Sequence, residues 1–227
     1  MKNYRAPRLG KSLAGFSLLF LFLASSAWAT VVTWDLNSGA TGTTSQTFTS
    51  SGYSITANGY TTGVPCTPLG LYFKTSGADL PGLDIVSTSD NQLQGNGLYP
   101  TTFIRFDVSS ILSQDFTDGQ LQIGNVSGSD SFVIYGSSAL GDPGTQIGGL
   151  YTSSSNLSFV SIANFANYKF ISMGAVTGGV LPVAFQATLE AVPEMGALFP
   201  IIGLILAVSL TELLRRRRIA QSRCGCR

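Results

Sequence analysis

The stretch Phe103-Ile104-Arg105-Phe106-Asp107-Val108 decides the fold class of this chain. Ile104, Phe106 and Val108 share one face of an extended segment, because successive side chains of a β-strand point to opposite sides. The stretch 120–123 alternates glutamine with leucine or isoleucine in the same way. Such alternation is typical of antiparallel strands that cover a core with one face and meet solvent with the other.

Similar β-rich runs recur throughout residues 30–190, and no stretch of that region shows sustained helical periodicity. Asn58-Gly59 and Asp118-Gly119 suit tight hairpin turns, and Asp142-Pro143-Gly144 suits a longer loop. The pattern predicts an all-β fold, an antiparallel two-sheet sandwich of the jelly-roll kind. We expect strands at 31–36, 46–49, 53–57, 69–74, 83–86, 103–108, 120–126, 132–135, 146–151, 157–162, 168–173 and 180–189.

The N-terminus has the three parts of a secretory signal peptide. Basic residues occupy positions 2, 5, 8 and 11, and a short apolar segment follows at 13–23. Ala27-Trp28-Ala29 then places small residues at the two positions that a signal peptidase reads. We therefore expect cleavage between Ala29 and Thr30, and export of the residues that follow.

The C-terminus carries a second apolar segment. Residues 195–214 are apolar except for Ser209, Thr211 and Glu212, and Arg215, Arg216, Arg217 and Arg218 follow directly. A helix of about 20 residues spans the hydrocarbon core of a bilayer. The arginines would stop translocation and hold that end in the cytoplasm. The sequence therefore predicts a single C-terminal transmembrane helix.

The exported region is acidic. Residues 30–190 contain three basic and ten acidic residues, a net charge of −7, whereas the whole chain is +1. An acidic surface repels phosphate backbones, so we expect no nucleic-acid partner. The chain has no histidine, which excludes Ser-His-Asp and Cys-His machinery. A pair of carboxylates could still form a glycosidase site, but Glu190 is the one glutamate of this region. We expect a protein that is not an enzyme.

Two features of the exported region fit a ligand. Asp79, Asp84 and Asp90 lie among glycines and amides, and such oxygen donors are what Ca²⁺ needs, although residues of this kind more often form a polar turn between two strands. No other cofactor is expected. Exposed tyrosines can stack on sugars, while half-buried tyrosines are ordinary strand residues. The tyrosines in question are Tyr53, Tyr60, Tyr72, Tyr99, Tyr135 and Tyr151.

The tail as a whole resembles a PEP-CTERM sorting signal. Val192, Pro193 and Glu194 precede the apolar segment, and the arginine cluster ends it. The resemblance implies recognition by an exosortase of a Gram-negative bacterium that makes exopolysaccharide, with cleavage at or near Pro193-Glu194. Met195 stands where the family usually has a second proline. The stretches 71–83, 104–108 and 133–137 are also similar to uncharacterised domains of PEP-CTERM proteins.

These observations divide the chain into four expected parts. Residues 1–29 form the signal peptide, 30–190 the exported β-sandwich, 191–218 the sorting signal and 219–227 a cytoplasmic tail. We expect a membrane-anchored precursor that becomes a cell-surface or extracellular-matrix protein with a structural or interaction role in exopolysaccharide or biofilm. The alternatives are a glycan-binding module that recognises extracellular polysaccharide, with or without calcium, and an uncleaved single-pass membrane protein.

Overall fold

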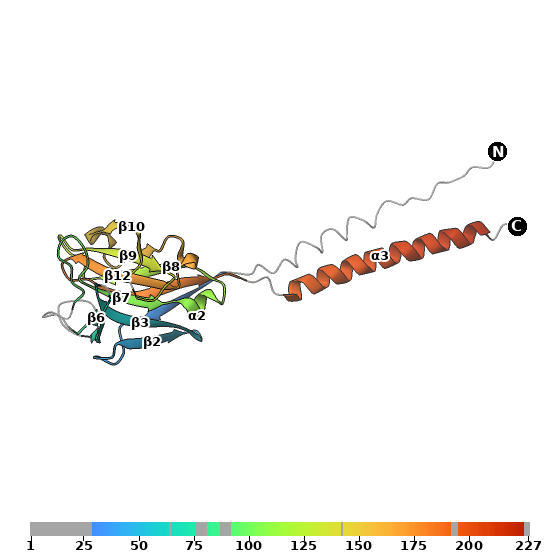
Figure 1. Ribbon diagram of the computed structural model, residues 1–227. Coiled ribbons are helices and arrows are strands. Elements are labelled where there is room, and N and C mark those ends of the chain that lie inside the picture. The colour runs from blue at the N-terminus through green and yellow to red at the C-terminus, as the bar shows by residue number, and fades with distance from the viewer. Residues whose placement is uncertain are drawn as a thin grey trace. The chain divides into compact units, whose positions relative to one another are not determined.

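The computed structural model describes residues 29–63, 65–75, 81–86, 92–141, 143–191 and 195–224, without the side chains of 195–201 and 218–224 (Figure 1). The chain divides into two compact units. One is Ala29–Glu190, which contains all the described strands. The other combines Met1–Trp28 with Ala191–Arg227, and its described part is Ala191 and the helix α3 (Met195–Cys224).

Two antiparallel sheets make up most of the strand-rich unit. Among the described residues, the first sheet has four strands, in the order β1 (Thr30–Asp35), β13 (Leu181–Leu189), β8 (Phe116–Gly124) and β11 (Phe159–Ser161). The second has seven, in the order β10 (Thr145–Tyr151), β9 (Ser131–Ser137), β12 (Phe170–Thr177), β7 (Thr102–Asp107), β3 (Tyr53–Thr61) and β2 (Ser45–Ser50), with β4 (Pro68–Leu69) also paired to β3.

The remaining elements are short. The strands β5 (Leu71–Lys74) and β6 (Gly82–Ile85) form a two-stranded sheet of their own. The helical turns α2 (Ser109–Leu112), η2 (Ser153–Ser155) and η3 (Phe165–Asn167) lie in connections between strands. The predicted all-β antiparallel fold is confirmed, and the strands lie close to the predicted ranges.

A single apolar core joins the inward faces of the two large sheets. The ring centroids of Phe106 on β7 and Phe185 on β13 lie 5.6 Å apart. Tyr53 on β3 meets Phe116 on β8 edge to face, with 4.8 Å between centroids. Trp34 on β1 is fully buried and donates its indole N–H to the Tyr53 carbonyl, 2.9 Å away. Contacts of this kind make the domain sandwich-like.

The two predicted hairpin turns are wrong. Asn58 and Gly59 lie inside β3, where a Cβ on Gly59 would come 2.8 Å from the Leu69 carbonyl oxygen of β4, so this glycine permits close strand approach. Asp118 has a positive φ of 43° but lies inside β8, beside a shift in its register with β13. It therefore forms a bulge. The loop predicted around Pro143 does connect β9 to β10.

The helix α3 has side chains described from 202 to 217, and those of its leucines, isoleucines and valine are mostly exposed. Glu212 and Arg216 form an ion pair at 3.6 Å on the helix surface. Within the residues that the structure describes, no helix is both long and apolar enough to cross a membrane.

Candidate binding groove

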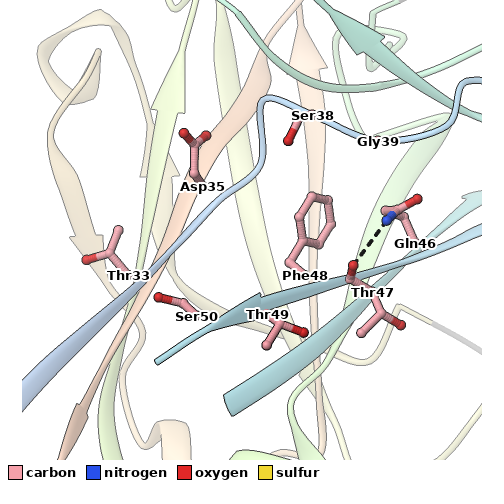
Figure 2. A pocket seen from close by; sticks show the side chains of 9 residues that line it. All are labelled: Thr33, Asp35, Ser38, Gly39, Gln46, Thr47, Phe48, Thr49 and Ser50. Carbon is pink, nitrogen blue, oxygen red and sulfur yellow. Dashed lines mark hydrogen bonds between the residues drawn. The ribbon is translucent and has the colours of Figure 1, made fainter. Parts of the chain in front are cut away.

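An open groove of about 460 Å³ lies between β1 and β2, the strands at the edges of the two large sheets. Figure 2 shows Thr33 and Asp35 on β1, Ser38 and Gly39 on the connecting loop, and the other lining residues along β2. The loop passes directly over the ring of Phe73, because a Cβ on Gly39 would lie 2.2 Å from its Cζ. Glycine at this position thus lets the loop form one wall of the groove.

The lining offers hydrogen-bonding groups and one carboxylate. Asp35 Oδ1 accepts a hydrogen bond from the Asn37 backbone N–H at 3.0 Å, which fixes the turn after β1. Thr33 Oγ1 interacts with the Gln186 side-chain amide at 3.0 Å. Phe48 is the aromatic residue of the lining, but it is only 6% exposed and its ring packs against Phe73. The groove therefore favours hydrogen bonding over stacking.

The hairpin that joins β2 to β3 determines which backbone groups face the groove. Ser51 and Gly52 form its two-residue turn with φ values of 53° and 85°, as a type I′ turn requires. The flanking pair Ser50–Tyr53 is then hydrogen-bonded, and pairing alternates along the ladder. Thr49–Ser54 and Thr47–Thr56 are accordingly non-hydrogen-bonded pairs.

Side-chain distances agree with this assignment. Thr49 Oγ1 lies 2.8 Å from Ser54 Oγ, and Thr47 Oγ1 lies 3.1 Å from Thr56 Oγ1, as expected where opposing side chains are close. The backbone N–H and C=O groups of Thr47 and Thr49 therefore point away from β3, toward the free edge. Gln46 Nε2 donates to the Thr47 carbonyl at 3.0 Å, so one edge acceptor is covered by an exposed side chain.

The sequence predicts a strand at 46–49, but it does not predict that this strand lies at the edge of a sheet. Strand order depends on pairing between distant segments, and no local signal specifies it. The one available hint is charge, because no charged residue occurs between Asp35 and Lys74. That neutral stretch includes β2 and β3, in a domain that is otherwise acidic.

The predicted calcium ligands are not brought together in the described residues. Asp79 and Asp90 lie outside them. Asp84 is a fully buried residue of β6, opposite Tyr72 of β5, and its Oδ1 accepts the Ile85 backbone N–H at 2.8 Å. Among the residues described, no group of three or more acidic or cysteine side chains is arranged to hold a metal ion. The calcium site stays a prediction.

The tyrosines do not form one platform. Tyr53 and Tyr151 pack on core phenylalanines, Tyr151 stacking on Phe132 at 5.0 Å. Tyr60 stacks on Phe103, with 5.4 Å between ring centroids. Tyr72 and Tyr135 are half-buried, and Tyr99 is exposed. Burial raises the pKa of Tyr135 above its ordinary value.

The residues expected to direct sorting are only partly described. Ala27, Val192, Pro193 and Glu194 lie outside the described residues, whereas Ala29 is described and Thr30 begins β1. Arg215, Arg216 and Arg217 are exposed on α3, and Arg218 belongs to the same helix.

Comparison of the chain with protein-family models and with curated proteins finds no match.

Proposed function

We propose that this chain is an exported, non-enzymatic surface or matrix protein, delivered as a membrane-anchored precursor and cut by an exosortase at its PEP-CTERM-like tail. The delivered part is the domain 30–190, with a structural or interaction role in an extracellular polysaccharide layer. Membrane and exosortase are its expected partners during delivery. The signal peptide, the sorting motif and the arginine cluster would direct export and delivery.

The pairing of the first strand with the last carries this proposal. Thr30 at the start of β1 lies opposite Leu189 at the end of β13, and the register runs without interruption to Asp35 opposite Ala184. Cleavage before Thr30 and near Pro193 would therefore remove chain on both sides without removing a strand. A domain whose ends meet in one sheet suits processing at both termini.

The side chains described on α3 support a membrane anchor. Between 202 and 214 the large apolar side chains other than Leu204 are each more than half exposed, which is costly in water and favourable in lipid. The hydroxyls of Ser209 and Thr211 donate to the carbonyls of Ile205 and Val208, at 2.7 and 2.8 Å. Polar groups satisfied within the helix suit an apolar surrounding. The full span of 195–214 rests on the sequence.

We also propose that the domain is a jelly roll with an insertion. The strands β1, β8, β11 and β13 form one sheet, and β7, β9, β10 and β12 supply four adjacent strands of the other. Eight strands that wrap between two sheets in this way are the jelly-roll arrangement. The strands β2 to β6 would then be an addition between the first and second strands, and it is this addition that carries the free edge.

Glycan binding is the alternative role for the delivered domain. The hydroxyl, amide and carboxylate groups of the groove between β1 and β2 favour it, because they match the hydrogen-bonding groups of a sugar. Binding of the purified full chain to the polysaccharide of its host, with and without Ca²⁺, would reveal such a role. Failure to bind under both conditions would count against it.

The sorting motif provides the direct test. Changing Pro193→Ala together with Glu194→Ala leaves the apolar segment and the arginines untouched, so membrane insertion should persist while shortening of the chain is lost. Immunoblots of membrane and surface fractions would show a full-length precursor that accumulates. Normal shortening of the double variant would contradict the proposed motif. Changing Thr188→Ala outside the motif serves as the control and should leave processing unchanged.

A further inference from the structure

The free edge of β2 differs from the other three open edges of the large sheets within the described residues. β11 has only three residues, and β10 carries a register shift between Ile147 and Tyr151 with Gly148 at a φ of 76°. β1 ends in the charged Asp35. Short, bulged and charged edges are the usual means by which proteins prevent edge-to-edge pairing.

β2 has none of these protections. Its six residues, Ser45-Gln46-Thr47-Phe48-Thr49-Ser50, contain no charge and no proline, and their register with β3 is uninterrupted. The groove beside it is open to solvent. Among the described residues, neither the Thr47 N–H nor the Thr49 N–H and C=O has a hydrogen-bond partner at this edge. A strand that approached the edge would find donors and acceptors already aligned.

We propose that β2 is a self-association edge, at which a second copy of this chain adds its own β2 in antiparallel fashion. Pairing about a two-fold axis through Thr47 would place Thr47 opposite Thr47 of the second copy and Ser45 opposite Thr49. The backbone groups directed to the free edge then meet one another, and the two seven-stranded sheets become one continuous sheet.

Charge identifies the second copy as the occupant. Residues 30–190 carry a net charge of −7, so most pairs of surfaces on two copies would repel each other. The stretch from Leu36 to Phe73 is free of charge and includes both β2 and β3. Two copies of β2 therefore bring no like charges of their own together, although Asp35 of β1 lines the groove beside this edge, and a two-fold interface is self-complementary.

Proline at position 47 tests the proposal on the full chain, purified in detergent. The Thr47 N–H points away from β3, so Thr47→Pro should leave the β2–β3 ladder intact while removing a donor from the edge. Sedimentation velocity should show a dimer for the parent chain and for the control Thr47→Val, which keeps the N–H. The dimer should be lost in Thr47→Pro at the same concentration, with an unchanged thermal transition.

A pair of oppositely charged variants at position 47 tests the proposal even if the proline variant is misfolded. Thr47→Lys and Thr47→Asp should each be monomeric alone, and an equimolar mixture should restore the dimer because the two positions face each other across the axis. A monomeric parent chain would overturn the proposal. So would a dimer that survives in both charged variants, because the contact would then lie elsewhere, for example along α3. Processing of the tail has no part in these outcomes, so the sorting proposal is tested separately.

Discussion

Arg105 shows how far a single side chain can depart from its sequence pattern. Strand alternation places it opposite the core-facing residues of β7, yet it is only 4% exposed. Its guanidinium carbon lies 4.4 Å from the ring centroid of Tyr60 and 5.1 Å from that of Phe170, and its Nη2 donates to the Tyr60 hydroxyl. Aromatic faces on neighbouring strands thus cover the cation. Alternation identifies the face of a residue, but not what later covers it.

We expect the packing of the Tyr60 and Phe170 rings to depend on the length of the Arg105 side chain. Arg105→Ala should lower the free energy of unfolding by about 2–5 kcal/mol, because it opens a cavity beneath the two rings. Arg105→Met fills the same space and removes a buried charge whose Nε has no hydrogen-bond partner among the described residues, so its cost should be much smaller. Urea unfolding followed by tryptophan fluorescence compares the variants. Equal losses would contradict a packing role.

Because of the half-buried phenol of Tyr135, we expect the free energy of unfolding to fall at high pH. Burial raises the pKa of its phenol above the ordinary 10.0. The folded protein therefore keeps a proton that the unfolded chain loses, and this stabilisation is complete below pH 10.0 and is lost as the pH rises through the folded pKa. When phenolate absorbance is followed as the pH is raised, the deprotonation at the highest pH should be missing in Tyr135→Phe. An unchanged high-pH end of the curve would assign that step to another tyrosine.

At the scale of elements, most strands could be predicted from the sequence, because alternation and β-branched residues are local signals. The part of β3 beyond residue 57 and the tight turn before β3 could not. Asn58-Gly59 has the composition of a turn but lies within β3, where glycine is needed for contact with β4. The real turn uses Ser51-Gly52, a weaker signal. The edge position of β2 is a property of strand order, which no single segment encodes.

The β2–β3 turn yields a pair of opposite predictions. Gly52 has a φ of 85° with open space around it, so Gly52→Ala should destabilise the domain by about 1 kcal/mol through backbone strain alone. Ser51→Asn creates the Asn-Gly pair that type I′ turns prefer and should raise stability. Thermal unfolding of both variants measures the two shifts. A gain for Gly52→Ala would show that the turn is not of this type.

At the scale of the whole molecule, we propose a complete β domain that is bounded by two processing sites. The sequence predicts the signal peptide, the apolar tail and the arginine cluster, because these depend on composition and order rather than on tertiary contacts. The pairing of Thr30 with Leu189 is visible only in the fold. It explains why the domain can lose both flanking segments and keep every strand of its four-stranded sheet.

Intact-mass analysis of the protein recovered from the cell surface would locate both cleavage sites. We expect a mature chain that begins at Thr30 and ends at or near Pro193-Glu194, with any added mass assigned to the group that accepted it. A surface product that retains α3 and ends at Arg227 would contradict cleavage at the sorting motif.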